Sequence, residues 1–329
     1  MSIVEYDNQA FLCDEGKTVL DVLLENGQDI PYSCKMGVCV ACVMRVIEGQ
    51  VSADSQAGLR ETLVAQGHFL PCVCQPGADL KVARIDEQDL FSPAVVLDID
   101  YLPPDVCRIY LQPATPLYYR AGQFVNLRRE DGLVRSYSLA SVPSQDQRLE
   151  FHVKKFDRGQ MSSWIVDDLK PGHHMSVQGP FGNCYYRPGR AEQNMLLIGT
   201  GTGLAPLIGI ARDALASGHR GQIWLYHGSR LVDGLYGDDP LRVMEQSHGN
   251  FHYVACVSGG TDRHGFRSGR ADDLAFDDRT DLQDWRIFLC GYAKMVYGAK
   301  TRAGDAGANS TNIYSDPYEL KDLRRQPRS

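Results

Sequence analysis

The stretch that decides the fold is residues 34–42, Cys-Lys-Met-Gly-Val-Cys-Val-Ala-Cys, in which three cysteines share one short loop. Their spacing is C-x4-C-x2-C, and Cys72 follows with 29 residues between it and the last of the three. Four thiolates in this order are the ligand pattern of a plant-type [2Fe–2S] cluster. The small residues Gly37 and Ala41 let the backbone wrap closely and direct N–H groups at the cluster sulfurs. The sequence therefore predicts a cluster with four ligands, namely Cys34, Cys39, Cys42 and Cys72.

Two alternatives to this ligand set remain open. A structural zinc site also uses cysteines, but zinc ligands usually come as two C-x2–4-C pairs, whereas here three cysteines crowd one loop. Cys74 competes with Cys72 for the fourth position, since only one residue separates them. We prefer Cys72 because Leu70-Pro71-Cys72 ends a return of the chain toward the loop.

The pattern of the remaining chain predicts three domains. Before and after the cysteine loop, a hairpin and short helix over residues 3–30 and a strand at 43–47 indicate a small α+β domain. A composition break near residues 91–93 introduces period-two strands and one helix at 161–168, which is typical of an antiparallel β-barrel. The barrel strands are expected at 94–99, 106–111, 123–127, 136–140, 149–154 and 175–178.

After residue 190 the pattern changes again, because strands and helices alternate. Strands are expected at 195–198, 222–227, 251–257 and 286–290, and helices at 205–216 and 241–246. This alternation favours a parallel, doubly wound α/β sheet. The predicted domains are residues 1–90, 91–190 and 191–329.

Charge is unevenly distributed along the 329 residues. The formal net charge is −7, which argues against a nucleic-acid partner. Residues 1–90 hold 6 Lys and Arg against 14 Asp and Glu, a net of −8, while the remainder is close to neutral. The first domain is therefore expected to be a separate unit with an electrostatic docking face.

The sequence predicts neither a secretory signal nor a membrane span. Residues 1–10 lack the basic segment and apolar core of a signal peptide. The most apolar run, residues 195–211, is interrupted by several glycines and a proline and is too short for a span. We therefore expect a cytoplasmic protein whose 10 cysteines are metal ligands, catalytic thiols or buried apolar residues rather than disulfides.

Two motifs in the barrel region suit a flavin dinucleotide. Residues 135–138 (Arg-Ser-Tyr-Ser) lie on a predicted strand, and residues 159–162 (Gly-Gln-Met-Ser) open the single helix. An arginine can pair with a pyrophosphate in a bidentate manner, and the ring of Tyr137 can stack on an isoalloxazine. The hydroxyl of Ser138 can bond the ring nitrogen that accepts hydride, and a helix N-terminus attracts phosphate. An ordinary exposed strand is the alternative; the residues expected to bind FAD are Arg135, Ser136, Tyr137, Ser138, Gly159, Gln160, Met161 and Ser162.

A glycine-rich loop follows the first strand of the doubly wound region. Its glycines permit a tight turn and a close approach to a phosphate, although a packing turn is an alternative. The strand at 222–227 leads to Ser229 and Arg230, which are expected to face the adenosine half of a nicotinamide dinucleotide. No carboxylate stands there to hold a ribose 2′-hydroxyl, and Arg230 could tolerate a 2′-phosphate, so NADPH stays open although we choose NADH. The loop residues expected to bind the dinucleotide are Gly199, Thr200, Gly201, Thr202 and Gly203.

These motifs, in this order, resemble a known family. Residues 25–34 and 45–49 are similar to the ferredoxin domain of the reductase components of bacterial aromatic-ring oxygenases. The two barrel motifs resemble the FAD domain of the ferredoxin–NADP+ reductase superfamily, which contains these reductases. The resemblance spans residues 1–318 and implies a β-grasp ferredoxin fold, then a barrel, then an NAD domain. Val40 stands where the family often has glycine, and a small effect on the cluster is expected.

The resemblance also implies roles for individual residues. The strand that includes His152, Val153 and Lys154 lies beside FAD in the family, and residues 179–182 match the closing turn of the barrel. Cys290 and Gly291 lie by the nicotinamide ring, and the aromatic that closes the family's sequence, here Tyr318, covers the flavin. The domain order favours FAD over the FMN of related reductases. The residues expected to act in catalysis are Tyr137, Ser138, Cys290 and Tyr318.

The implied activity is electron transfer from NADH through FAD and the [2Fe–2S] cluster to a protein partner. The hydride delivers two electrons to the flavin, and the cluster passes them on singly. By resemblance, the partner is the terminal oxygenase of an aromatic-ring dioxygenase or monooxygenase, or its small ferredoxin. A monomer without nucleic-acid or membrane partners is expected. Two alternatives are a reductase for another acceptor, such as a deoxysugar dehydratase, and a redox sensor without turnover.

Overall fold

The computed structural model describes residues 2–30, 32, 35, 37, 42–59, 61–84, 91–102, 104–260 and 265–318. The chain divides into two compact units, Met1–Phe91 and Ser92–Ser329. In the described part, no helix is long and apolar enough to cross a membrane.

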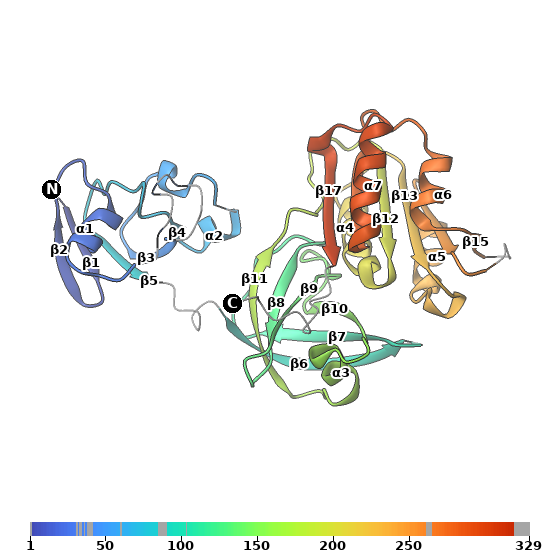
Figure 1. The fold of residues 1–329 in the computed structure, drawn as a ribbon, viewed down its shortest axis with the longest axis horizontal. Coiled ribbons are helices and arrows are strands. Elements are labelled where there is room, and N and C mark those ends of the chain that lie inside the picture. Colours follow the sequence, from blue (N-terminus) through green and yellow to red (C-terminus); the bar gives the residue numbers. More distant parts are fainter. Residues whose placement is uncertain are drawn as a thin grey trace, which may run out of the picture. The chain divides into compact units, whose positions relative to one another are not determined.

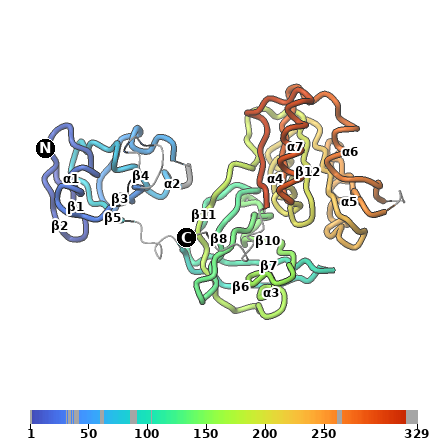
Figure 2. The backbone as a smooth tube through the Cα atoms, viewed as in Figure 1, coloured from blue at the N-terminus to red at the C-terminus, as the bar shows by residue number. Residues whose placement is uncertain are grey.

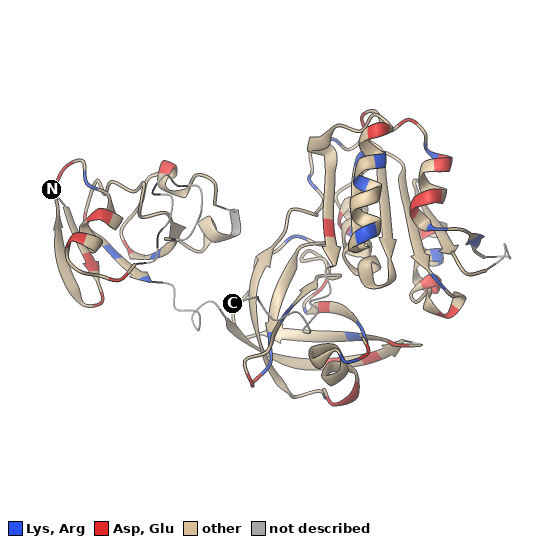
Figure 3. Ribbon diagram, viewed as in Figure 1, with Lys and Arg blue, Asp and Glu red and all other residues tan. Residues whose placement is uncertain are grey.

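The first unit is a mixed sheet with a helix packed on it (Figure 1). The strand order is β2-β1-β5-β3-β4, with β1 and β5 parallel and the other pairs antiparallel. Helix α1 buries Val19, Leu20 and Leu23 completely, and Thr18 caps it by accepting a hydrogen bond from the Asp21 N–H (3.2 Å). Acidic side chains lie along this helix (Figure 3). The elements are β1 (Ser2–Tyr6), β2 (Gln9–Cys13), α1 (Val19–Glu25), β3 (Met44–Glu48), α2 (Glu61–Ala65), β4 (His68–Phe69) and β5 (Leu80–Arg84).

The second unit begins with a six-stranded antiparallel sheet that closes on itself. Its order is β10-β7-β6-β11-β8-β9, and an antiparallel bridge between Leu139 and Phe151 joins the two outer strands. The Ala140 N–H also donates to the Glu150 carbonyl (2.9 Å), so the predicted barrel is confirmed. Its interior is apolar because alternate residues of each strand point inward. The elements are β6 (Ser92–Leu102), β7 (Val106–Pro113), β8 (Phe124–Arg128), β9 (Val134–Ser138), β10 (Leu149–Lys154), α3 (Gln160–Asp167) and β11 (His174–Phe181).

A parallel six-stranded sheet completes the second unit, with order β15-β14-β13-β12-β16-β17 (Figure 1). One face packs on α4 and α5 and the other on α6 and α7. On β12, Leu197 packs against the first pair of helices and Leu196 against the second. The strand is therefore apolar on both faces, as in sheets covered on both sides. Figure 2 follows the backbone from the barrel (cyan to green) into this domain (yellow to red). The elements are β12 (Met195–Thr200), α4 (Leu204–Ala216), β13 (Ile223–Ser229), α5 (Asp238–Ser247), β14 (Phe251–Val257), β15 (Arg267–Ser268), α6 (Ala271–Asp278), β16 (Arg286–Tyr292), α7 (Ala293–Asp305) and β17 (Ile313–Tyr318).

The predicted fold classes are confirmed, but the sequence did not predict all of the helices and strands. Residues 149–154 and 251–257 form strands at the predicted bounds, whereas α6, α7 and β17 are additions. Helix α7 contains glycines, and α6 carries four aspartates in eight residues, so neither shows a clear apolar period. The domain limits at residues 90 and 190 stay predictions.

Candidate functional site

The strand order of the parallel sheet reverses beside β12, and this places the glycine-rich loop at a topological switch point. The chain steps outward from β12 to β15 and then returns to add β16 on the other side. Ligands of open α/β sheets bind at such points, beyond the carboxyl ends of the strands. Gly199 pairs with Cys290 across the switch, so the two predicted dinucleotide segments lie side by side.

Only glycine fits at two positions of this switch point. A Cβ on Gly203 would lie 2.3 Å from the Cys290 carbonyl oxygen. A Cβ on Gly291 would lie 2.6 Å from the Thr200 carbonyl oxygen, and Gly291 also has a φ of +117°. Backbone atoms cannot rotate away, so both positions keep the two strand ends in close contact. The loop continues into the short 3-10 turn Gly201–Gly203 and then α4, whose first N–H, that of Leu204, bonds back to the Gly201 and Thr202 carbonyls.

A hydrogen-bonded group joins the barrel to the last strand of the sheet. Ser138, at the end of β9, donates from its hydroxyl to Asp316 Oδ2 (2.8 Å). The Tyr318 hydroxyl donates to Ser138 Oγ (3.0 Å) and reaches the Thr202 carbonyl (3.5 Å). Ser138 and Tyr318 are 180 residues apart in the chain. The structure therefore brings together predicted residues from the flavin motif, the glycine loop and the C-terminal segment.

Asp316 belongs to this group and is absent from the predicted set. Burial raises the pKa of its carboxyl to about 6, although the Ser138 hydrogen bond opposes the rise. The signal in the sequence was an acidic residue inside an otherwise closing strand, Tyr314-Ser315-Asp316-Pro317. Nothing in the local sequence distinguishes it from a carboxylate that faces solvent.

Replacing Asp316 with asparagine is expected to stabilise the second unit at alkaline pH and to have no effect in acid. The folded-state pKa is above the ordinary value of about 3.9, so stability falls as the pH rises from about 3.9 through about 6 and stays at that lower level above it. Asparagine can still accept the Ser138 hydrogen bond. Melting temperatures of the D316N and wild-type proteins should differ at pH 8 and converge below pH 4. Equal melting temperatures at pH 8 would contradict a buried carboxylate.

Cys290 lies in the core beside a second cysteine. Its sulfur is 3.6 Å from that of Cys184, and both residues are almost fully buried. Burial raises the pKa of Cys290 well above its ordinary value, so the group is a neutral thiol at physiological pH. Cys184 belongs to the apolar core of the second unit.

The two barrel motifs lie on β9 and at the start of α3. Arg135 donates to the Val134 carbonyl (2.7 Å), and Ser136 donates to Asn126 Oδ1 (2.7 Å). Tyr137 is half-buried, and burial raises the pKa of its hydroxyl. The Arg129 guanidinium, between β8 and β9, donates to the Gln160 carbonyl (3.5 Å) and so joins this edge of the barrel to α3.

Helix α3 begins at Gly159 without a side-chain cap. A Cβ on Gly159 would lie 2.3 Å from Ser162 Oγ, so a larger residue there would displace the Ser162 hydroxyl. The uncapped N–H groups and the nearby arginine are donors that fit the phosphates of a dinucleotide. The half-buried tyrosine offers a ring surface that fits a flavin. Met161 and Val153 point into the core, and Lys154 pairs with Asp105 (3.1 Å).

In the first unit, the described cysteines separate into two environments. The thiols of Cys42 and Cys72 hydrogen-bond each other, and burial raises the pKa of Cys42 to about 12. Cys74 is fully buried beside Ser55, and its carbonyl accepts the Val19 N–H (2.8 Å) at the start of α1. The paired thiols are the donors a [2Fe–2S] cluster requires. Cys34 and Cys39 lie outside the described residues.

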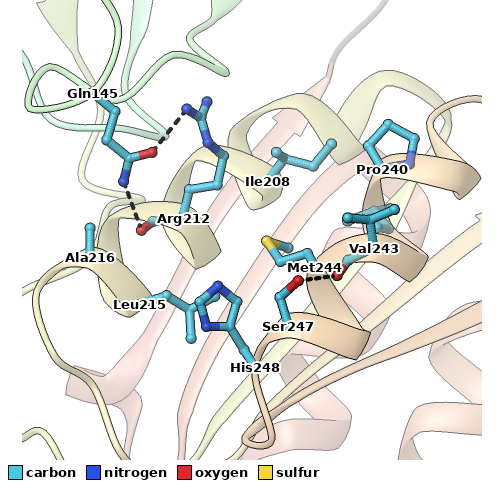
Figure 4. Close-up of a pocket in the computed structure, with 11 residues that line it drawn as sticks. Gln145, Ile208, Arg212, Leu215, Ala216, Pro240, Val243, Met244, Ser247 and His248 are labelled. Atoms are coloured by element: carbon cyan, nitrogen blue, oxygen red, sulfur yellow. Dashed lines mark hydrogen bonds between the residues drawn. The ribbon is translucent and has the colours of Figure 1, made fainter.

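A groove of the second unit lies away from this site. It has a volume of about 460 Å³ between α4 and α5, with Ile208, Leu215 and Met244 among its lining residues (Figure 4). Arg212 at its rim is held by Gln145 and Asp146. The groove includes none of the predicted site residues, and the switch point is the better candidate because the chemistry-bearing groups converge there.

Three protein families match consecutive parts of the chain. The 2Fe-2S iron-sulfur cluster binding domain matches residues 3–77, the oxidoreductase FAD-binding domain residues 104–186, and the oxidoreductase NAD-binding domain residues 197–301. Each match covers the motif that predicted the corresponding cofactor.

Full-length relatives share this arrangement. The reductase subunit of an aromatic O-demethylase from Amycolatopsis is 34% identical over 298 residues, 86% of this chain and 88% of that protein. The ferredoxin–NAD(P)+ reductase component of the naphthalene 1,2-dioxygenase system of Pseudomonas putida is 30% identical over 323 residues, 96% of this chain and 98% of that protein. A CDP-6-deoxy-L-threo-D-glycero-4-hexulose-3-dehydrase reductase from Yersinia pestis is 27% identical over 320 residues, 94% of this chain and 95% of that protein. The crystal structure of an Amycolatopsis cytochrome P450 reductase aligns with a TM-score of 0.64 at 30% identity, covering 96% of this chain and 98% of that one.

Proposed function

The chain belongs to the family of iron–sulfur flavoprotein reductases that serve as ferredoxin–NAD(P)+ reductase components of bacterial oxygenase systems, and we propose that it conveys electrons from NADH to the terminal oxygenase, or its small ferredoxin, of an aromatic-ring oxygenase. The observation that carries the proposal is the Ser138, Asp316 and Tyr318 group, which joins the barrel to the carboxyl edge of the parallel sheet. NADH as donor and a monomeric state are parts of the same proposal.

When bound, FAD would accept a hydride, and the cluster would transfer electrons one at a time. Arg135 and the uncapped start of α3 would hold the pyrophosphate of FAD, and Tyr137 would lie against its ring. The loop from Gly199 to Gly203 would present N–H groups to the pyrophosphate of NADH.

The residues that meet at the switch point position the two ring systems. Ser138 carries a hydroxyl whose proton is held by Asp316, so the oxygen is fixed at the end of β9. The neutral, buried thiol of Cys290 presents no charge to a nicotinamide ring. The Tyr318 hydroxyl bridges Ser138 and the glycine loop. Tyr318 would have to move before a nicotinamide ring could reach the flavin, so it would act as a gate.

Replacing Tyr318 with serine is expected to tighten NAD+ binding by about two- to tenfold, because the nicotinamide ring no longer displaces a stacked aromatic worth about 0.5–1.5 kcal/mol. Relative activity with NADPH should rise, since the nicotinamide end then binds without displacement. Tyr318→Phe, which keeps the ring, is the matched control and should retain wild-type affinity.

The measurement is a titration of NAD+ into each oxidised variant, read from the flavin absorbance. If Tyr318→Ser binds NAD+ no more tightly than Tyr318→Phe, the ring does not gate the site.

Turnover separates the proposed function from a redox sensor. Steady NADH oxidation with ferricyanide and with cytochrome c as acceptors is expected for the purified holoenzyme. A protein that binds NADH without turnover would support the sensor. Oxygenase and dehydratase candidates encoded nearby should then be compared as acceptors, and faster reduction of a dehydratase would overturn the oxygenase assignment.

A further inference from the structure

A chain of buried polar side chains connects the barrel with the dinucleotide loop. His152 on β10 uses both ring nitrogens, one toward Glu150 Oε1 (2.9 Å) and the other toward the Tyr236 hydroxyl (3.1 Å). Tyr236 lies between β13 and α5, so this contact crosses from the barrel into the parallel domain.

Tyr236 continues the chain to a second histidine. Its ring packs edge-to-face against His227, with ring centres 5.7 Å apart, and against His152 at 5.4 Å. His227 contacts the glycine loop directly, because its Nε2 lies 3.1 Å from the Gly201 carbonyl oxygen. A carbonyl can only accept, so Nε2 carries the proton and donates it.

The buried polar side chains of this chain reduce the stability of the fold unless each polar atom has a partner. The exposed fraction is 0% for His227, 5% for Tyr236 and 8% for His152. Burial lowers the pKa of His227 to about 4, so the ring is neutral at physiological pH. Its Nδ1 has no hydrogen-bond partner among the described residues. An apolar side chain would avoid this unpaired atom, so packing alone does not account for a histidine here.

The contact fixes which way the loop peptides face. Gly201 has a φ of +53°, and its carbonyl is held by His227 from inside the domain. The next carbonyl, that of Thr202, is the one reached by the Tyr318 hydroxyl. When the protein holds the carbonyls of a turn, the N–H groups of that turn remain free to bind a phosphate. If a peptide of the turn rotated, its carbonyl oxygen would take the place of the N–H and would repel the phosphate.

We propose that His227 is a positioning residue for the coenzyme pyrophosphate, and that Tyr236 and His152 hold it there from the barrel. The inference rests on the proposed function in one respect, the assignment of the glycine loop to NADH. It adds that the affinity for the ADP-ribose half of the coenzyme depends on a side chain that does not touch the coenzyme.

The test measures binding of ADP-ribose, which contains the pyrophosphate and lacks the nicotinamide ring, by calorimetry on the FAD- and cluster-loaded full chain. His227→Leu removes the side-chain donor to the Gly201 carbonyl, which keeps only the Leu204 N–H, and the dissociation constant should rise about two- to tenfold, as expected for the loss of one hydrogen bond. His227→Gln retains an N–H donor and should restore most of the affinity. Tyr236→Phe removes only the hydroxyl that meets His152 and should weaken binding by a smaller factor.

His219 offers the matched control, because it is also a buried histidine whose pKa burial lowers to about 4, and it contacts Tyr186 rather than the loop. His219→Leu should lower the melting temperature and leave ADP-ribose affinity unchanged. In steady-state assays, His227→Leu should raise the KM for NADH and leave kcat close to that of wild type.

Three results would overturn the proposal. The first is wild-type ADP-ribose affinity in His227→Leu, or in Tyr236→Phe if the leucine variant does not fold. The second is failure of His227→Gln to restore affinity. The third is a loss of affinity in His219→Leu that matches its loss of melting temperature. A wild-type protein that binds neither ADP-ribose nor NADH would instead contradict the proposed function.

Discussion

Replacing Cys72 with alanine is expected to abolish the [2Fe–2S] cluster, whereas replacing Cys74 with alanine is expected to leave it in place. The two residues are separated by one position, yet the thiol of Cys72 meets that of Cys42 while Cys74 is enclosed in the core beside Ser55. A cluster held by four thiolates cannot keep its charge balance and geometry when one ligand is missing. Cys74→Ala removes one buried atom and should lower stability by about 1 kcal/mol.

Iron content and visible absorbance of the purified variants distinguish the two. Cys72→Ala should lose most of its iron and nearly all cytochrome c reduction, but should keep FAD and its reduction by NADH. Cys74→Ala should keep both activities. The opposite pattern, with iron lost only from Cys74→Ala, would make Cys74 the fourth ligand.

A methyl group on Gly203 is expected to disable hydride transfer. The Cβ of alanine would lie 2.3 Å from the carbonyl oxygen and 2.6 Å from the carbonyl carbon of Cys290. Both are backbone atoms of a central strand, so the glycine loop and the end of β16 must move apart. Overpacking of this kind costs about 1–3 kcal/mol, and kcat/KM for NADH should fall by about ten- to a hundredfold if that energy is lost from the transition state.

Gly298→Ala is the control for this substitution. Gly298 lies within α7, and a Cβ there would have no neighbour within 4 Å. Alanine in a helix interior stabilises by about 0.5–1 kcal/mol relative to glycine, so this variant should melt slightly higher and retain full activity. Wild-type kcat/KM in Gly203→Ala would show that the two segments need not remain in contact.

The sequence was most informative where chemistry constrains the chain locally. The cysteine spacing, the Arg135–Ser138 motif and the glycine loop each lie within a few residues, so they can be recognised without a fold. The barrel strands alternate between core and solvent, and the period of two located them. The parallel, doubly wound sheet followed from the alternation of strands and helices, whereas its strand order, and with it the switch point, came from the structure.

What the sequence did not predict depends on contacts between distant segments. Asp316 joins the site only because β17 pairs with β16 and thereby faces Ser138 of the barrel. His227 was seen only as part of a strand end, and nothing local indicated that its ring holds the Gly201 carbonyl. Helix α7 was missed because its glycines weaken the helical pattern, and its buried residues compensate only after it packs on the sheet.

The most direct test of the account follows both cofactors during a single reaction. The holoenzyme is mixed rapidly with NADH in the absence of oxygen, and the flavin and cluster absorbances are recorded together. The account predicts that flavin absorbance falls first and that cluster absorbance falls afterwards, within the time of one turnover with cytochrome c. Reduction of the flavin with no change in the cluster on that timescale would contradict electron transfer through the [2Fe–2S] domain.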